Sequence, residues 1–183
     1  VSEQNSERII IYMYDGNGSP IGFMCCRTED VDDDNHCFDV YYYEKNLQGD
    51  VIAVRDENGA IRYSYLYNAW GELVYAYAHN GAENTTARYN TIFYRSYYFD
   101  EDLCLYYLNT RYYDAYIGRF ISPDDISYLG ANGDLNAYNL YAYCSNNPVM
   151  YSDPSGHFII SISANTTLGD TAVKVFLHPF HVI

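Results

Sequence analysis

Residues 111–157 carry the pattern that decides the fold: RYYDAYIGRFISPDDISYLGANGDLNAYNLYAYCSNNPVMYSDPSGH. Short runs rich in Tyr, Phe, Ile and Val alternate there with Asp, Asn, Pro and Gly. Short aromatic runs separated by turn residues indicate β-strands rather than long helices. We predict tight loops over residues 119–124 and 146–156, and one short helix near residues 135–143.

The chain upstream repeats a simple unit over residues 41–75. A run of aromatic or β-branched residues is followed by Asp or Asn, two further residues, Gly and another run, with the glycines at Gly49, Gly59 and Gly71. Asp and Asn favour turns, and Gly supplies the positive φ that tight turns need. One such unit cannot bury a face alone and needs neighbours. The pattern predicts β-hairpins, either in a repeat array, which we favour, or in an ordinary antiparallel meander.

Composition limits the classes of function. The chain has 183 residues, 24 of them Tyr, and a net charge of −14. Tyr suits half-buried sheet surfaces, and each hydroxyl needs a polar partner, so we expect a large sheet with a semi-polar inner face. The acidic balance would repel phosphates, which argues against a nucleic-acid partner. No apolar run is long enough to predict a membrane span.

Two stretches deserve comparison with metal sites. The first contains Cys25, Cys26, His36 and Cys37. Its spacing fits no zinc pattern, and a loop with free or paired thiols is the better interpretation. The second is the acidic run 29–34, which has the alternating Asp of a calcium loop but Asn35 and Tyr41 where such loops have Gly and Glu. We therefore expect no metal and no cofactor.

The order of motifs in residues 111–157 resembles the Rhs repeat-associated core domain, which follows the repeats of Rhs and YD-repeat shells. The motifs are Arg-Tyr-Tyr-Asp at 111–114, Gly-Arg-Phe at 118–120, Ser-Pro-Asp at 122–124, Asn-Leu-Tyr at 139–141 and Asp-Pro-Ser-Gly at 153–156. The resemblance implies an all-β fold, in which antiparallel hairpins of a spiral shell precede a core plug domain.

The resemblance also implies an organisation in four parts. YD/Rhs-type repeats occupy residues 1–78, a polar linker 79–94, the core domain 95–157 and a short variable tail 158–183. Within the tail, residues 159–163 have the alternation of one strand. The family carries its toxin beyond the core domain, but 27 residues are too few to bury a core of their own. The toxin cargo is therefore expected to be absent or truncated in this chain.

Core domains of this family can act as aspartic peptidases on their own chain, cutting just after the Asp-Pro-x-Gly motif. The resemblance assigns the two carboxylates to Asp124 and Asp153 and the supporting arginine to Arg111. Two close carboxylates can share a proton, so that one activates water while the other protonates the leaving group. Without the resemblance, the two aspartates would be interpreted as turn residues and the arginine as an ion-pair partner between strands.

Departures from the family pattern concern the chemistry directly. Cys104 stands where the turn after Asp100 usually has Gly, so we expect that turn to be strained or remodelled. His157 stands where cleaving members have Leu or Met, an apolar side chain that would dock in a pocket. The expected cleavage segment is Gly156, His157 and Phe158, with the cut after His157 or Phe158.

Three functions follow as hypotheses. The chain could close a shell, with upstream repeats of the same polypeptide and a C-terminal toxin cargo as its partners. It could also be a self-cleaving aspartic peptidase. Alternatively, it could be an adhesion module that holds surface glycans on the aromatic residues between Tyr41 and Tyr77, a hypothesis that fails if these face a closed interior. In all three cases we expect a bacterial protein that is secreted or displayed at the cell surface.

Overall fold

The computed structural model describes residues 2–4, 8–28, 31–32, 35–36, 38–129, 138–157, 159–167 and 170–177. Every regular element in these ranges is a β-strand or a short 3₁₀-helix, so the predicted all-β fold is confirmed. The helix predicted near residues 135–143 lies mostly outside the described residues. Two compact units form, one of Val1–Tyr67 with Leu73–Ser96 and one of Asn68–Glu72 with Tyr97–Ile183.

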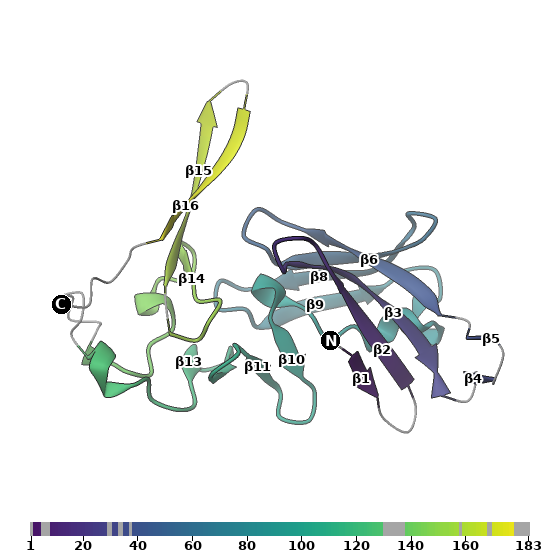
Figure 1. Cartoon of the computed structure of the whole chain (residues 1–183), viewed down its shortest axis with the longest axis horizontal. Coiled ribbons are helices and arrows are strands. Elements are labelled where there is room, and N and C mark those ends of the chain that lie inside the picture. Colours follow the sequence, from purple (N-terminus) through teal and green to yellow (C-terminus); the bar gives the residue numbers. More distant parts are fainter. Residues whose placement is uncertain are drawn as a thin grey trace. The chain divides into compact units, whose positions relative to one another are not determined.

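The first unit contains a seven-stranded antiparallel sheet (Figure 1). Its strands, in spatial order, are β1 (Ser2–Gln4), β2 (Arg8–Tyr14), β3 (Pro20–Arg27), β6 (Asp39–Lys45), β7 (Val51–Asp56), β8 (Ile61–Tyr67) and β9 (Leu73–Ala78). The short strands β4 (Val31–Asp32) and β5 (Asn35–His36) pair with each other between β3 and β6. Apart from this excursion, neighbours in the chain are neighbours in the sheet.

Four turns between strands of this sheet share one geometry. In each turn the Oδ1 of Asp or Asn accepts hydrogen bonds from the backbone N–H groups two and four residues further on. The Gly three residues on has a φ between 80° and 91°. The four opening residues are Asp15, Asn46, Asp56 and Asn68. The repeat of Asp or Asn, two residues and Gly therefore forms the turns that its sequence predicts.

Residues 79–94, which we expected to form a polar linker, are packed against the sheet of the first unit. The segment folds into η2 (Ala82–Asn84) and η3 (Thr86–Tyr89), and η4 (Tyr94–Ser96) follows it. Thr91 is 1% exposed and shares a hydrogen bond with the Tyr12 hydroxyl. The Tyr43 hydroxyl donates to Asn90 Oδ1, which lies 2.9 Å away. The polar groups of this segment thus serve buried tyrosines, as a semi-polar inner face requires.

The second unit contains two small sheets (Figure 1). The first consists of β10 (Tyr98–Asp100), β11 (Leu105–Tyr107), β12 (Tyr112–Asp114) and β13 (Arg119–Phe120), and the second of β14 (Tyr151–Ser152), β15 (Ile160–Thr167) and β16 (Asp170–Leu177). The strand predicted at residues 159–163 is confirmed as the start of β15, which pairs with β14 and β16. No described helix is long and apolar enough to cross a membrane.

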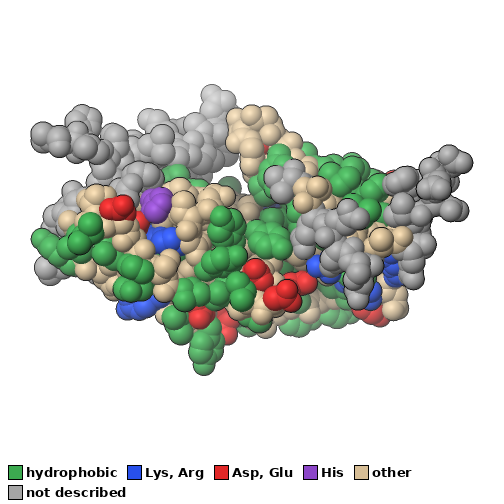
Figure 2. Space-filling view, turned by 60° about the horizontal axis from the view of Figure 1, so that its bottom comes forward, with side chains coloured by type: hydrophobic (Ala, Val, Ile, Leu, Met, Phe, Trp, Pro, Cys, Tyr) green, Lys and Arg blue, Asp and Glu red, His purple; other side chains and the backbone are tan. Residues whose placement is uncertain are grey.

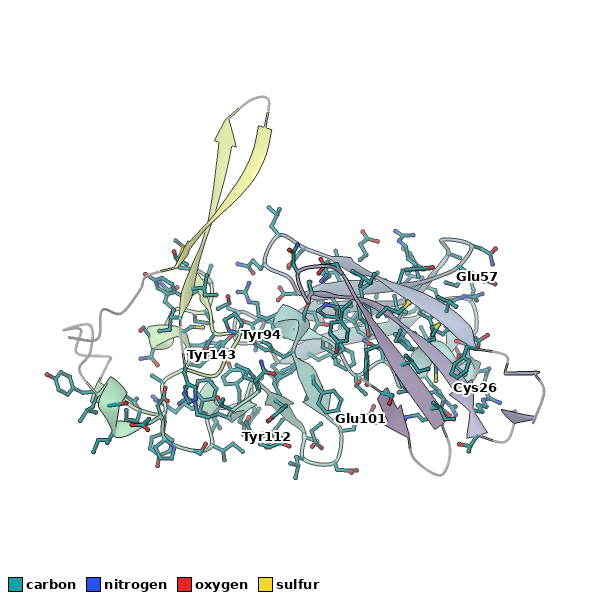
Figure 3. The ribbon with its side chains drawn as sticks, in the orientation of Figure 1. Cys26, Glu57, Tyr94, Glu101, Tyr112 and Tyr143 are labelled. Carbon is teal, nitrogen blue, oxygen red and sulfur yellow. The ribbon has the colours of Figure 1, made fainter. Side chains whose placement is uncertain are left out.

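Aromatic side chains form the core of the second unit. The rings of Tyr113 and Tyr143, both fully buried, have centroids 4.1 Å apart, and Phe120 packs edge-on against each of them. Tyr143 is labelled in Figure 3. Hydroxyl groups that reach this core find backbone acceptors: the Tyr113 hydroxyl donates to the carbonyl of Trp70 over 2.6 Å. These contacts fix the strands from which the candidate site is built.

The turn after β10 is strained, which is one of the two outcomes that its missing Gly predicts. Cys104 adopts a φ of 57°, in the left-handed region that L side chains rarely occupy. The Oδ1 of Asp100 accepts hydrogen bonds from the N–H groups of Asp102 and Leu103, so the turn is still closed by its aspartate. The substitution of Gly by Cys costs backbone strain, because the exposed Cys104 has a Cβ that disfavours the left-handed conformation.

Candidate functional site

The residues assigned by resemblance come from the ends of three strands in the second unit. Arg111 directly precedes β12, Asp124 follows β13 by four residues, and Asp153 directly follows β14. The backbone fixes each position: the N–H of Asp124 donates to the Leu140 carbonyl over 2.9 Å. The structure brings the three side chains together in one cluster.

The Arg111 guanidinium is the centre of this cluster. Its Nη2 lies 2.9 Å from Asp124 Oδ2 and 3.7 Å from Asp153 Oδ2. Arg111 and Asp153 are buried, with side chains 5% and 3% exposed, and the Asp124 side chain is 10% exposed. Burial lowers the pKa of the Arg111 guanidinium, while the two carboxylates act in the opposite direction. One cation therefore contacts both carboxylates.

Arg111 also binds two backbone carbonyls. Its Nη1 donates to the Leu140 carbonyl over 3.0 Å, and its Nε donates to the carbonyl of Gly156. The face of the guanidinium lies on the Phe120 ring, with Cζ 3.6 Å from the ring centroid. Planar stacking and several directed hydrogen bonds are what Arg offers and Lys does not. The side chain is thus held in one orientation against the Gly156–His157 peptide bond.

Asp153 opens a buried turn. Its Oδ1 accepts a hydrogen bond from the Gly156 N–H over 2.8 Å, and its own N–H donates to the Tyr97 hydroxyl. Burial raises the pKa of Tyr97 well above its ordinary value, so this hydroxyl keeps its proton. The turn lies against the β11–β12 connection, where Thr110 Oγ1 donates to the Ser155 carbonyl over 2.7 Å. Asp153 is therefore both a turn residue and a neighbour of Arg111.

Gly156 could not be another residue without rearrangement of the site. It has a φ of 79°, and a Cβ built there would lie 2.4 Å from Thr110 Oγ1 and 2.8 Å from the Leu108 carbonyl oxygen. Both the backbone conformation and the close approach of a second backbone require Gly. The motif thus positions its last carbonyl on Arg111 by packing as well as by turn geometry.

His157 enters the site as a fourth member. Its Nδ1 lies 2.6 Å from Asp124 Oδ1, and its side chain is 28% exposed. On the face that Figure 2 draws, histidine atoms (purple) lie near acidic (red) and basic (blue) side chains, without a label for any one residue. Its backbone N–H donates to Ser155 Oγ over 3.2 Å. Cleaving members of the family have an apolar docking residue at this position, and here His157 instead makes a polar contact with a candidate carboxylate.

Several members of the site escaped the sequence analysis. Leu140 and Gly156 act through backbone carbonyls, which no side-chain pattern reveals. Phe120 was considered only as part of the Gly-Arg-Phe motif, and Tyr97 only as part of the core domain. Phe158 lies outside the described residues. Among the residues that the structure describes, no group of three or more His, Cys, Asp or Glu is arranged to hold a metal ion.

Several toxins are similar to this chain in sequence, although no family model matches. The tRNA nuclease WapA of Bacillus subtilis (strain 168) is 40% identical over 119 residues, which are 65% of this chain and 5% of WapA. Double-stranded DNA deaminase toxin A of Burkholderia cenocepacia (strain H111) is 32% identical over 64% of this chain and 8% of that protein.

A crystal structure of TcdB2-TccC3 without its hypervariable C-terminal region has the same fold. It matches with a TM-score of 0.64 at 28% identity, over 82% of this chain and 7% of that chain. The chain therefore spans less than a tenth of each of these three proteins. The sequence relatives are Rhs-type polymorphic toxins and the structural neighbours are Rhs shells, so the comparisons support an Rhs toxin-related protein.

Proposed function

We propose that this chain closes an Rhs-type β-shell and cuts its own backbone next to the Asp153–Gly156 turn. Asp124 and Asp153 would be the catalytic carboxylates, and Arg111 would orient them. The observation that carries this proposal is the shared guanidinium, which lies within 2.9 Å of one carboxylate and 3.7 Å of the other. The same guanidinium donates to the carbonyl of Gly156.

The reaction would be a hydrolysis. One ionised carboxylate removes a proton from water as the water oxygen bonds to the carbonyl carbon. The other carboxyl group, protonated at the start, gives its proton to the peptide nitrogen as the C–N bond breaks. A new carboxyl terminus and a new amino terminus result. Arg111 would stabilise the negative charge that develops on the carbonyl oxygen.

The contact made by Arg111 favours one of the candidate bonds. The guanidinium donates to the Gly156 carbonyl, which belongs to the Gly156–His157 bond. The sequence hypothesis instead puts the cut after His157 or Phe158. Each of the three bonds gives a different fragment mass. Intact mass spectrometry of the purified chain therefore shows whether cleavage occurs and which bond is cut.

Two observations support the role in a shell. Strands β1 and β9 are the edges of the described seven-stranded sheet, and a sheet edge can pair with further strands. The chain also covers only 5–8% of its two toxin relatives, which leaves most of a larger polypeptide for such strands. We propose upstream repeats of the same polypeptide and a C-terminal toxin cargo as partners, in a protein secreted by, or displayed on, a bacterium.

The test of cleavage compares the parent chain with Asp124→Asn and Asp153→Asn. We expect the parent to lose its C-terminal segment and both variants to stay intact, because each lacks one of the two carboxylates. Circular dichroism establishes that the variants fold. A folded parent that stays intact, or variants that are cut like the parent, would overturn the peptidase proposal and leave a structural plug.

Two exposed tyrosines on β9 support adhesion as a second candidate function. Tyr41 and Tyr65 are buried, which removes them from any glycan surface. However, Tyr75 and Tyr77 on β9 are about half exposed, and their rings stack with centroids 6.1 Å apart. Exposed stacked aromatic rings suit sugar rings. Saturable binding on a glycan array that is lost in a Tyr75→Ala, Tyr77→Ala double variant would support this function, and its absence would remove it.

A further inference from the structure

The Asp124 carboxylate has three contacts within the structure. Its Oδ1 accepts a hydrogen bond from the Asp125 N–H over 2.8 Å and lies 2.6 Å from His157 Nδ1. Its Oδ2 lies 2.9 Å from Arg111 Nη2. An ionised carboxylate accepts only about four hydrogen bonds. In this arrangement the histidine takes a position on Asp124 that an attacking water would need.

His157 is more exposed than Arg111, Asp124 and Asp153. Its side chain is 28% exposed, whereas those of Arg111 and Asp153 are 5% and 3% exposed. It also belongs to the segment that would be cut, since its N–H donates to Ser155 Oγ within the turn. A rotation of its side chain toward solvent would free Asp124 and leave the buried arginine and carboxylates in place.

Two side chains from elsewhere in the chain contact the Asp124 carboxylate, the Arg111 guanidinium and the His157 imidazole. Without the imidazole, Asp124 would keep Arg111 as its ion-pair partner. The other charged group at this place is Asp125, whose carboxylate is exposed and accepts from the Ser127 N–H.

We infer that His157 is a positioning residue that holds Asp124 in an inactive, water-excluding state, and that cleavage requires its side chain to leave. This inference rests on the proposed self-cleavage. It adds that a residue of the cleaved segment, His157, slows the reaction by its contact with Asp124. It predicts slow cleavage in the parent chain and faster cleavage when the imidazole is removed.

The experiment follows the loss of the C-terminal segment with time, by intact mass, in the parent, His157→Ala and His157→Gln. We expect His157→Ala to be cut at least tenfold faster than the parent. Gln can hydrogen-bond to the carboxylate but carries no charge, so we expect an intermediate rate. Asp124→Asn combined with His157→Ala should abolish cleavage. His79→Ala is the matched control, since His79 bonds to Ser64 in the first unit, and it should be cut at the parental rate.

A spectroscopic readout tests the contact without cleavage. In the parent, the short contact with Asp124 should give the imidazole Nδ1–H a proton resonance far downfield, and Asp124→Asn should remove that resonance. If the parent is cut in an Asp124-dependent and Asp153-dependent manner while His157→Ala is cut equally fast or more slowly, the inference fails and the proposed function stands. If neither folded protein is cut, both fail.

Discussion

Two turns of this protein have the same sequence spacing and different surroundings. Asp56 to Gly59 closes a hairpin in the first unit, and Asp153 to Gly156 closes a turn in the second. The Asp56 Oδ1 accepts the N–H groups of Asn58 and Ala60, and the Asp153 Oδ1 accepts that of Gly156. The Gly three residues on has a φ close to 80° in both turns. Each aspartate also faces an arginine. The local pattern of Asp, two residues and Gly therefore gives a turn closed by its aspartate, with a left-handed Gly, in both places.

The difference lies in what surrounds each turn. Nothing lies within 4 Å of a Cβ built on Gly59, whereas one built on Gly156 would meet a hydroxyl at 2.4 Å and a carbonyl oxygen at 2.8 Å. Arg62 pairs with Asp56 alone and is 30% exposed, whereas Arg111 is 5% exposed and contacts two carboxylates. The motif alone specifies a turn. The candidate site also needs the packing of Gly156 against the Leu108 carbonyl and the pairing of Arg111 with a second carboxylate, Asp124.

The largest expected effect comes from removing each arginine. Arg111→Met leaves two buried carboxylates without their cation, and we expect a loss of about 3–5 kcal/mol in the free energy of unfolding. Arg62→Met breaks a partly exposed pair and should cost about 1 kcal/mol or less. Urea unfolding, followed by the fluorescence of Trp70 for the second unit and by circular dichroism for the whole chain, measures both. Equal losses would contradict the contrast between the two turns.

Substitution of the two glycines tests the packing part of the comparison. Gly59→Ala should cost about 1–2 kcal/mol, because only the left-handed backbone conformation is penalised. Gly156→Ala adds the collision with the Leu108 carbonyl and Thr110, and overpacking of this kind costs about 1–3 kcal/mol more. Thermal unfolding of the two variants gives the order. A Gly59 variant that is as unstable as the Gly156 variant would show that the close approach carries no cost.

The smallest effect is a pH dependence of the first turn. Desolvation raises the pKa of Asp56, but hydrogen bonds from the Ala60 N–H, Arg62 and the Asn58 N–H outweigh it, so the folded pKa is below the ordinary value. The unfolded chain therefore binds the proton first as pH falls. The stabilisation is present above the ordinary pKa of Asp and is lost as pH falls through the lowered value. Melting temperatures measured from pH 6 down to pH 2 should fall less in Asp56→Asn than in the parent.

The sequence predicted the local features of this fold and missed those that depend on distant contacts. The strands and their turns follow from alternation and from Asp or Asn with Gly, and the resemblance selected Arg111, Asp124 and Asp153. The contact between His157 and Asp124 could not be predicted, because the two residues are separated by 33 positions and an irregular loop. The polar composition of residues 79–94 predicts a linker. The sequence does not reveal that these polar groups pair with tyrosines of distant strands.

The most direct test of this account replaces the two aspartates that open the matched turns. Asp153→Asn and Asp56→Asn are made as two separate variants of this chain. The intact mass of each variant and of the parent is followed with time. The account predicts that the parent and Asp56→Asn lose the C-terminal segment at the same rate and that folded Asp153→Asn stays whole. Cleavage of Asp153→Asn at the parental rate, or a folded parent that is never cut, would contradict it.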